Sequence, residues 1–401
     1  MNLALETTLF FAMRFNVFPI VIPDGFTVQL SSPLDERLGT KRFTPSQMIS
    51  MNKTGDAVIV LDREPPKRHI SLVPSDINTS TTDRQRLLIL RPDRTSHIIG
   101  PPSGAIFATQ PFGAAAELDA TRHPIFRDLQ IVSAKISASS EVFVTQKHNF
   151  YGAYSGVDLW SSYLERGQWH AVPAPKAMRQ GLNLIVTAPA DERHFGFSIN
   201  YERATNYAGP DAQTGVIDQD EAWVNDGFLN HFVGNGFISA VSGNKYVGFN
   251  SHFSPELSNN VRSPDAFGWS YGRRRHLGHG FPWAINQSGI AVGDNRAFAT
   301  SVGQPVIWDR GRTLPLSSAI GSAYSINDRN QVVGDIFTRG AFLATLKNQK
   351  VQFVMLDSIL AQAARGWRVT HAYAIASNGC ILASGSSKND HESLLFLCPD
   401  S

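Results

Sequence analysis

The chain reads Ala284-Ile285-Asn286-Gln287-Ser288-Gly289-Ile290-Ala291-Val292-Gly293 past its middle and Ser325-Ile326-Asn327-Asp328-Arg329-Asn330-Gln331-Val332-Val333-Gly334 further on. The two stretches align without a gap. A third copy keeps the apolar positions and the turn glycine in Ala374-Ile375-Ala376-Ser377-Asn378-Gly379-Cys380-Ile381-Leu382-Ala383. Self-similarity of this kind indicates a repeat architecture. Weaker copies centre on Met51, Ile136, Ala188 and Val241.

The spacing of these copies indicates what each repeat contains. From Ile136 to Ile375 the copies follow one another at intervals of 41 to 53 residues, near the span of a four-stranded propeller blade. The interval from Met51 to Ile136 is 85 residues, so it holds either an unrecognised blade or one blade with a long insertion. Residues 62–86 are rich in Pro, Ser and Thr and are typical of a loop, which favours the insertion. We therefore predict seven blades, with eight as the alternative.

Each copy is followed by a second apolar element and another turn. These elements include Leu87-Leu88-Ile89-Leu90, Val157-Asp158-Leu159-Trp160, Ala222-Trp223-Val224, Ala266-Phe267-Gly268-Trp269 and Pro305-Val306-Ile307-Trp308, and the turns include Asp309-Arg310-Gly311 and Glu165-Arg166-Gly167. One unit thus reads strand, turn, strand, variable loop, strand, turn, strand, which predicts an antiparallel up-and-down blade. Asn52, Asn286 and Asn327 occupy the first turn, where an Asn side chain can bond to its own backbone.

A family resemblance rests on these residues. The pattern Ala-x-Ile-Asn-x-x-Gly-x-Val-Val-Gly, followed by Ala-Phe-x-Trp and a Gly turn, resembles the bacterial HAF-type extracellular repeats. The match is good at residues 284–293 and 323–343 and fair at residues 372–397. The resemblance implies a propeller-like fold and often a secreted or cell-surface protein. It implies no common activity.

Composition agrees with an all-β class. Of the 401 residues, 42% are hydrophobic and only 17% are charged, with 32 Gly and 22 Pro, which suits many short strands joined by tight turns. We predict a single β-propeller over residues 26–401 that follows an N-terminal segment over residues 1–25. The net charge of +2 gives no field that would favour nucleic acid as a partner.

No segment has the length of a membrane span. Near the N-terminus the longest unbroken apolar stretch is Leu9-Phe10-Phe11-Ala12-Met13, too short for a signal-peptide core or a span. We expect a soluble chain without a membrane span, and its compartment stays open. The basic run Arg273, Arg274 and Arg275 follows Tyr271-Gly272, where the repeat predicts a hairpin turn, so we interpret it as a solvated turn.

The ends of the chain bear on closure of the ring. An open edge strand invites aggregation, so the first and last blades should be joined. The last repeat ends at Leu394-Leu395-Phe396-Leu397 without an outermost strand, and we predict that Phe26-Thr27-Val28-Gln29-Leu30 supplies it. A hairpin centred on Asn389 would place Cys380 opposite Cys398. A disulfide is feasible there, and two buried thiols are the alternative.

Two motifs that suggest chemistry have structural explanations. Gly268-Trp269-Ser270-Tyr271-Gly272 matches the Gly-x-Ser-x-Gly nucleophile elbow, but an elbow needs a following helix and the repeat predicts a strand, so Ser270 should be a turn residue. His276 and His279 are three residues apart, a spacing that does not put both on one face of a strand, and no carboxylate or Cys with ligand spacing accompanies them. We therefore predict no catalytic serine and no metal there.

The acidic residues Asp211, Asp218, Asp220 and Glu221 lie in a predicted 20-residue loop and could collect Ca²⁺, but their spacing matches no ordered Ca²⁺ loop. Walker, dinucleotide and Cys-x-x-Cys motifs are absent from the sequence. We expect no catalytic motif, no metal and no cofactor.

Long insertions recur between the second and third strands, at residues 62–86, 146–156, 200–220 and 250–265. Alternate connections of a blade emerge on the same side, so these loops should share one face of the disc, and function in such scaffolds concentrates in loops. They hold aromatic, imidazole and carboxylate groups that suit a neutral polar ligand such as a glycan, or a protein partner. The predicted ligand-binding residues are His148, Tyr151, Tyr154, Tyr201, Tyr207, Asp211 and His252.

The leading hypothesis is a non-enzymatic binding or interaction propeller that uses this long-loop face. The competing hypothesis is a glycan-active hydrolase or lyase with carboxylates such as Asp211, Asp218 or Asp220 at the central pocket. The third hypothesis is a purely structural surface protein.

Overall fold

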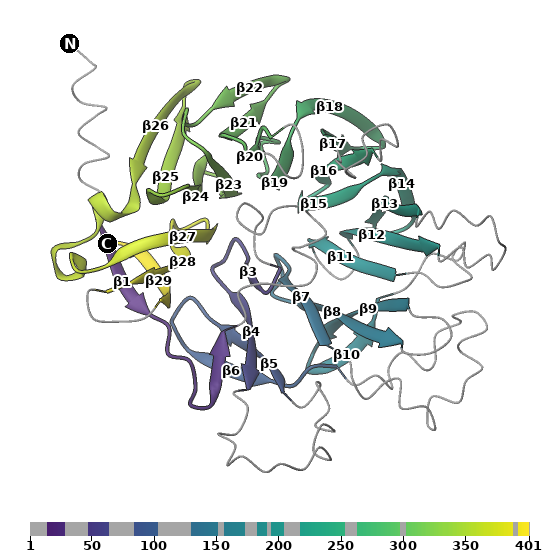
Figure 1. The fold of residues 1–401 in the computed structure, drawn as a ribbon, viewed down its shortest axis with the longest axis horizontal. Helices are drawn as coiled ribbons and strands as arrows, with labels where there is room; N and C mark the ends of the chain where they lie inside the picture. The colour runs from purple at the N-terminus through teal and green to yellow at the C-terminus, as the bar shows by residue number, and fades with distance from the viewer. Residues whose placement is uncertain are drawn as a thin grey trace, which may run out of the picture.

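The protein is an all-β, seven-bladed propeller (Figure 1). The structure is a computed structural model that describes residues 14–28, 47–63, 84–102, 130–150, 156–172, 183–190, 194–203, 217–252, 263–296, 302–387 and 392–400. These residues form seven antiparallel sheets around a central axis, six of four strands and one of five. The predicted fold class and the count of seven blades are confirmed, and the interval from Met51 to Ile136 contains one described blade.

Within each blade the strands run from the axis to the rim in chain order. The first blade contains β3 (Ile49–Met51), β4 (Ala57–Arg63), β5 (Gln85–Leu90) and β6 (Ser96–Ile99); the second β7 (Gln130–Ile136), β8 (Val142–Phe150), β9 (Gly156–Glu165) and β10 (Gln168–Ala171); the third β11 (Asn183–Pro189), β12 (His194–Arg203), β13 (Ile217–Asp226) and β14 (Asn230–Asn235); and the fourth β15 (Phe237–Ser242), β16 (Lys245–His252), β17 (Ser263–Ser270) and β18 (Arg273–His279).

The fifth blade contains β19 (Phe281–Ile285), β20 (Ala291–Asp294), β21 (Pro305–Asp309) and β22 (Arg312–Pro315); the sixth β23 (Gly321–Ile326), β24 (Gln331–Ile336), β25 (Gly340–Lys347) and β26 (Lys350–Met355); and the seventh β27 (Arg368–Ile375), β28 (Ile381–Ser386) and β29 (Ser393–Pro399). Two 3₁₀ helices, η5 (Leu356–Ile359) and η6 (Gln362–Ala364), lie between β26 and β27. No helix in the described part of the chain has the length and apolar character needed to cross a membrane.

The core lies between neighbouring sheets. Every residue of β20 and β24 is buried, because the middle strands of a blade are covered on both faces by the adjoining blades. Val292 and Ile307 of the fifth blade pack with Val332 and Phe342 of the sixth in one apolar cluster. The outermost strands β18 and β22 are largely exposed, and β18 begins with three arginines.

Two-residue hairpins join the third and fourth strands of several blades. Tyr271 and Gly272 have φ values of 50° and 73°, and Arg310 and Gly311 have φ values of 49° and 82°. Positive φ at both central residues is the turn geometry whose twist matches paired strands. Ser270 is the last residue of β17 and pairs with Arg273 of β18. It therefore lies beside a β-turn with a strand after it, as the repeat predicted.

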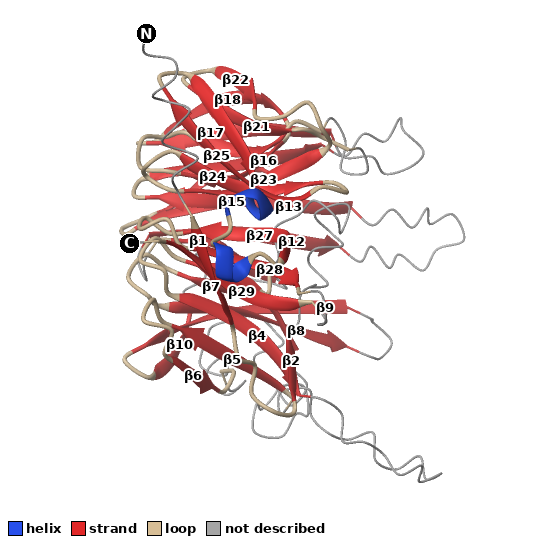
Figure 2. Ribbon diagram, turned by 90° about the vertical axis from the view of Figure 1, so that its left-hand side faces the viewer, coloured by secondary structure: helices blue, strands red, loops and turns tan. Residues whose placement is uncertain are grey.

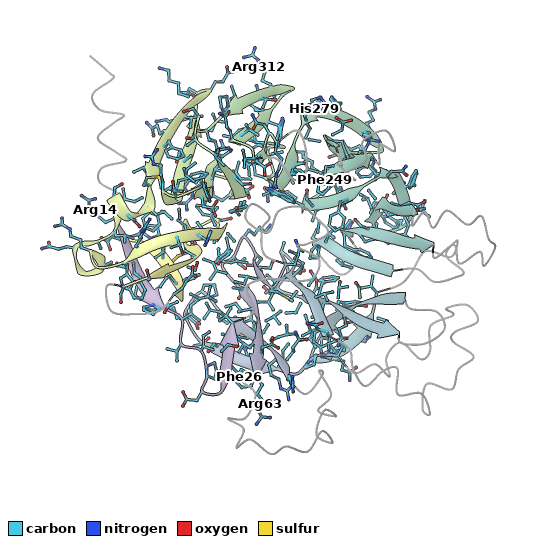
Figure 3. The ribbon with its side chains drawn as sticks, viewed as in Figure 1. Arg14, Phe26, Arg63, Phe249, His279 and Arg312 are labelled. Carbon is cyan, nitrogen blue, oxygen red and sulfur yellow. A yellow bond between two sulfur atoms is a disulfide. The ribbon has the colours of Figure 1, made fainter. Side chains whose placement is uncertain are left out.

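The ring is closed by an N-terminal strand, but not by the predicted one. β1 (Phe15–Pro19) pairs antiparallel with β29 and forms the outermost strand of the seventh blade. Part of the predicted segment does form a strand, β2 (Phe26–Val28). It pairs, however, with the C-terminal end of β4 in the first blade, where Phe26 lies beside Arg63 (Figure 3). The prediction that residues 26–30 pair with the last blade was therefore wrong. The described strands of the propeller begin at Phe15, before residue 26, where we predicted the propeller to start.

Cys380 and Cys398 are joined by a disulfide, with 4.2 Å between their Cα atoms. The register of β28 with β29 pairs Ile381 with Leu397, which is the register that the hairpin argument expected. Leu394 O accepts a hydrogen bond from Ile20, so alternate residues of β29 direct their backbone groups toward the N-terminal segment. Cys398 therefore faces Cys380 in a non-hydrogen-bonded pair, the pair type in which opposed residues approach most closely.

Candidate functional site

The first turns of neighbouring blades bond to one another around the axis. Asn286 Nδ2 donates to the carbonyl oxygen of Asn327 over 3.2 Å, and Asn327 Nδ2 donates to the carbonyl oxygen of Ala376 over 3.0 Å. The backbone N–H of Ser377 then donates to Lys53 O in the first blade. These turns therefore share one face of the disc (at the left in Figure 2), and the connections between second and third strands leave from the other face.

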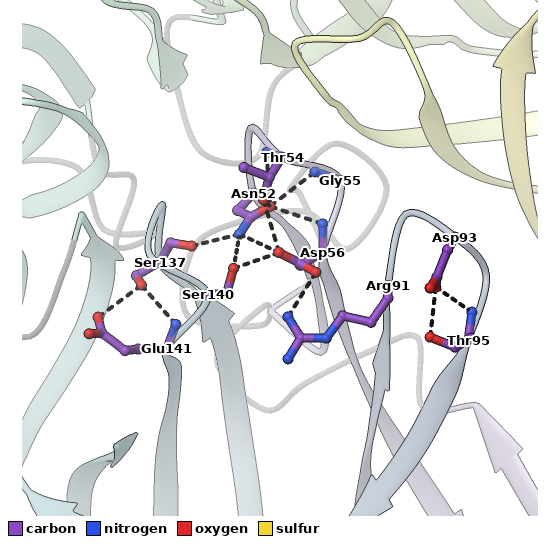
Figure 4. Close-up of polar contacts among 10 residues, drawn as sticks. All are labelled: Asn52, Thr54, Gly55, Asp56, Arg91, Asp93, Thr95, Ser137, Ser140 and Glu141. Carbon is purple, nitrogen blue, oxygen red and sulfur yellow. Dashed lines mark hydrogen bonds and ion pairs between the residues drawn. The ribbon is translucent and has the colours of Figure 1, made fainter. Parts of the chain in front are cut away.

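Asn52 holds the same position in the first blade (Figure 4). Its Oδ1 accepts from the N–H groups of its own turn, as the sequence predicted, and its Nδ2 donates to Ser137 O of the second blade over 2.9 Å. Beneath it, burial raises the pKa of Asp56, but hydrogen bonds from Ser140, Arg91 and Thr54 outweigh burial, so this pKa lies below its ordinary value. The cluster is fully engaged in joining two blades.

The innermost strands of the fifth, sixth and seventh blades each contain an aromatic residue that has no partner in the second strand of the blade. In each strand the register with the second strand shifts at the aromatic position, and these positions are Trp283, Tyr324 and Tyr373. A β-bulge leaves the extra residue unpaired and re-aims its side chain. All three side chains line the central cavity.

Two of these aromatics bond to carboxylates that occupy matching positions in adjacent blades. Trp283 Nε1 donates to Asp294 Oδ2 over 3.0 Å, and Tyr324 Oη donates to Asp335 Oδ1 over 3.1 Å. Asp294 and Asp335 each follow a Val-Gly pair near the end of the second strand. The geometry therefore repeats from one blade to the next, at the end of the channel away from the first turns.

Asp294 is fully buried and all of its bonds are structural. Arg296 donates to it through Nε over 2.6 Å and through Nη2 over 2.8 Å, and Ser322 of the sixth blade donates over 2.9 Å. The Arg296 guanidinium also lies over the Phe281 ring at 4.6 Å. A buried ion pair is tolerated when its remaining hydrogen-bonding capacity is met, as here.

Asp335 and His371 form the second polar centre. His371 Nδ1 lies 2.6 Å from Asp335 Oδ2, across the junction of the sixth and seventh blades. The hydrogen bond with Asp335 raises the pKa of His371 above its ordinary value, despite partial burial. Burial raises the pKa of Asp335 as well, although His371 and Tyr324 oppose that change. The imidazole remains 47% exposed, so the dyad has one buried and one accessible member.

Glu392 completes the polar groups of the seventh blade. Its Oε1 accepts from Thr370 Oγ1 and from Ser384 Oγ, each over 2.8 Å. Ser384 in turn accepts from Tyr373 Oη over 3.2 Å, and burial raises the pKa of Tyr373 well above its ordinary value. The carboxylate of Glu392 is therefore held by two hydroxyl groups of its own blade, one of which also bonds to Tyr373.

A cavity runs along the axis in two connected parts. The inner part has a volume of about 200 Å³, and the part at the first turns has a volume of about 420 Å³. They share lining residues, among them Met51, Ile136 and Ser325. The inner part is lined by aliphatic residues, among them Ile49, Ile136 and Val241, by the aromatic residues Phe237, Trp283, Tyr324 and Tyr373, and by polar residues that include Gln47, Ser50, Lys135, Thr187 and Ser239.

The predicted ligand-binding residues fall where the structure gives no side-chain description. Tyr151, Tyr154, Tyr207 and Asp211 lie outside the described residues. The backbones of the other three lie in strands whose side chains there are not described: His148 in β8, Tyr201 in β12 and His252 in β16. All three strands are second strands of their blades and end on the long-loop face.

The prediction for the histidine pair was wrong in one respect. Asp265 lies across the strand pair, with its Oδ1 2.9 Å from His279 Nδ1 and 3.8 Å from His276 Nε2. The register of β17 with β18 shifts beside Phe267, so residues three apart turn toward the same carboxylate. Among the described residues, no three His, Cys, Asp or Glu side chains are grouped as a metal ion would require.

The prediction that Asp218, Asp220 and Glu221 lie in a loop was also wrong. Asp218, Asp220 and Glu221 lie within β13 and pair with β12 instead of lying in a long loop. Glu221 accepts a hydrogen bond from Trp223 Nε1 over 3.0 Å. The backbone of residues 218–221 therefore follows one regularly paired strand.

The channel residues were missed from the sequence. Asp294, Asp335 and His371 carried no motif of their own, although Val-Gly-Asp at 292–294 and 333–335 is a repeated signal that points to the two carboxylates. The partner of His371 lies in the neighbouring blade, so only the folded ring brings them together.

No protein-family model matches the sequence, and no curated protein matches it. Solved structures do resemble it. The β-propeller domain of the Trilobed protease from Pyrococcus furiosus is 9% identical over 89% of this chain and 93% of that chain, with a TM-score of 0.47. An acylaminoacyl peptidase from Pyrococcus horikoshii is 13% identical over 88% of this chain and 51% of that one, with a TM-score of 0.48.

The soluble aldose sugar dehydrogenase from Escherichia coli is 10% identical over 96% of this chain and 100% of that chain, with a TM-score of 0.33. These likenesses concern the propeller fold and transfer no activity to this chain.

Proposed function

We propose that this chain is a non-enzymatic binding propeller whose ligand is a neutral polar molecule of the glycan class. The observation that carries the proposal is the lining of the channel: Trp283, Tyr324 and Tyr373 are aimed inward by β-bulges, and the carboxylates beside them are engaged in bonds within and between blades. Aromatic faces accept the C–H faces of a sugar, while hydroxyl and amide groups bond to its hydroxyls.

The proposal extends to the long-loop face. His148, Tyr151, Tyr154, Tyr201, Tyr207, Asp211 and His252 belong to or adjoin the connections that leave from the end of the channel where Asp335 and His371 lie. We assign these residues to the outer part of the same binding site. A ligand would then contact loop side chains first and the bulged aromatics beneath them.

The state of the ionisable groups supports binding over catalysis. A general base must accept a proton at the working pH, and the raised pKa of His371 favours its protonated form, which donates. Asp294 is neutralised by Arg296, and Glu392 is held by two hydroxyl donors. Such groups are suited to orienting ligand hydroxyls.

One observation favours the alternative, a glycan-active hydrolase or lyase. Asp335 holds His371 by Nδ1, which is the arrangement that orients a catalytic imidazole with Nε2 toward a substrate. In a lyase this imidazole would abstract a proton beside a sugar carboxylate. A lyase therefore needs an acidic glycan, whereas the leading proposal needs a neutral one.

A panel of neutral and acidic glycans, followed by calorimetry on those that bind, tests the proposal. Tyr373→Ala in the channel and Tyr201→Ala on the long-loop side should each weaken binding about tenfold or more. Tyr271→Ala, which removes an exposed rim tyrosine, is the matched control and should leave affinity unchanged. Full affinity in both test variants, or no binding to any glycan, would contradict the proposal.

We also infer that the repeats are of the HAF type and that the protein works outside the cytoplasm. The repeat pattern at residues 284–293 and 323–343 supports the first inference, and the bond between Cys380 and Cys398 supports the second, because disulfides persist in oxidising compartments. Cell fractionation with immunodetection tests the location. Recovery of the protein only in the cytoplasm would contradict it.

A further inference from the structure

Two neighbouring hairpins present large apolar side chains to solvent. Phe228 and Leu229, between β13 and β14, are 92% and 65% exposed, and Tyr271, between β17 and β18, is 79% exposed. Phe232 of β14 is 53% exposed. Exposed apolar residues gathered in this way mark interaction surfaces more often than scattered ones do. We call Phe228, Leu229 and Tyr271 the apolar tips; the Phe232 ring instead lies beside Trp223, on the face of β14 opposite to His231.

The first of these tips is held rigidly. Asp226 Oδ1 accepts the N–H groups of Phe228 over 3.1 Å and Leu229 over 2.9 Å, and its Oδ2 lies 2.6 Å from His231 Nε2. These bonds, led by the one from Leu229, lower the pKa of Asp226 to about 2. Asn225 Oδ1 accepts from Gly227 as well. The two apolar side chains are thus presented by an ordered turn.

The two hairpins pack side by side in the third and fourth blades, whose outermost strands β14 and β18 adjoin at the rim (Figure 1). The ring of His231 lies 5.7 Å from that of Trp269. Arg274 Nη1 donates to Val233 O over 3.3 Å. The turns that carry Phe228, Leu229 and Tyr271 therefore lie at the same ends of two blades that pack against each other.

Positive charge adjoins them. Arg273 follows the Tyr271 turn directly and, with Arg275, is exposed on the side of β18 opposite to Arg274, which packs over the Phe267 ring at 4.5 Å. Lys245 begins β16 and pairs with Ser270 beside the same turn. Asp226 lies at the base of the first turn, beside His231.

We propose that the apolar tips and the two arginines dock this face of the rim on a negatively charged lipid surface. The tips are convex hairpin ends, so they can enter a deformable interface without needing a matching hollow in a partner. Exposed Phe and Leu gain free energy by leaving water at the headgroup boundary, and Tyr is favoured there. Arg273 and Arg275 are attracted to anionic headgroups, and such attraction weakens with salt.

Flotation with vesicles of phosphatidylcholine alone and with added phosphatidylglycerol tests the proposal on the full chain. We expect binding to the anionic vesicles that falls with added salt. Phe228→Ser combined with Leu229→Ser should lower the partition coefficient about tenfold or more. Arg273→Gln combined with Arg275→Gln should lower it roughly tenfold.

The matched control replaces the exposed Arg310 and Arg312 by Gln in the β21–β22 hairpin, where Arg312 lies at the rim (Figure 3) and the Arg-Gly turn has no apolar tip residue. It should bind like the wild type, and all variants should melt alike because the substituted side chains are exposed. Absence of vesicle binding, equal binding to neutral vesicles, or unchanged binding of the Phe228 and Leu229 variant would each overturn the proposal. If the protein self-associated through the tips and did not bind vesicles, the proposal would also be overturned, and the partner of this surface would be a second copy of the chain.

Discussion

Asn286 donates a hydrogen bond to the carbonyl oxygen of Asn327, its own counterpart in the next blade, over 3.2 Å. Asn327 repeats the contact with Ala376. In each case the same side chain accepts from the N–H groups of its own turn. One residue type therefore shapes the turn and joins the blades, which explains why Asn recurs at this position.

Replacing Asn327 by Ala should destabilise the protein by about 2 to 3 kcal/mol, because buried N–H and C=O groups in two blades lose partners. Chemical denaturation measures the change. Arg329→Ala, an exposed side chain in the same turn, is the control and should change the free energy of unfolding by less than about 0.5 kcal/mol. Equal effects of the two substitutions would contradict the role of the Asn side chain.

Deleting residues 1–20 should abolish a single cooperative transition. The deletion removes β1, exposes the edge of β29 and takes the fully buried Phe15 out of the core. Deleting residues 1–13 keeps β1 and is the matched control, which should retain the single cooperative transition. If both truncated proteins melted alike, closure by β1 would be refuted.

Thiol titration of the unfolded protein without reductant should find no free thiol, and after reduction it should find the two cysteines of the sequence. The bond closes a short segment, with a sequence separation of 18, so reduction should cost about 2 to 4 kcal/mol of stability. Two titratable thiols before reduction would exclude the bridge.

The pKa of His371 is raised by its hydrogen bond with Asp335, so His371 stabilises the folded state below pH 6.5, and this contribution disappears as pH rises through the raised pKa. Compared with His371→Gln, the wild type should lose free energy of unfolding as pH is raised from about 6 to about 8. Denaturant titrations at each pH measure the difference. A difference that stays constant over this range would contradict the pairing.

The fold could be predicted from the sequence because the repeated motifs recur at intervals that match a four-stranded blade. Turn residues such as Asn286 and Gly289 recur at matching positions, and the apolar alternation between them fixes the strands. The closing strand could not be chosen in this way. Phe15–Pro19 and Phe26–Val28 are both short and apolar, and β1 pairs with residues near the other end of the chain.

The channel could be predicted only in part. Trp283, Tyr324 and Tyr373 occupy the same position in three repeats, directly before Ala-Ile or Ser-Ile, but the bulges that leave them unpaired become visible only in the register of the strands. The pairing of Asp335 with His371 depends on the angle between two blades. Local patterns hold no information about such contacts.

The central claim, that the propeller binds a glycan without converting it, is tested most directly by one measurement. A glycan identified by the panel is incubated with the protein, its binding is measured by calorimetry, and the recovered glycan is analysed for new reducing ends or unsaturated sugars. The account predicts saturable binding, weakened by Tyr373→Ala, and full recovery of the intact glycan. New reducing ends or unsaturated products that disappear in His371→Gln would contradict it and identify an enzyme.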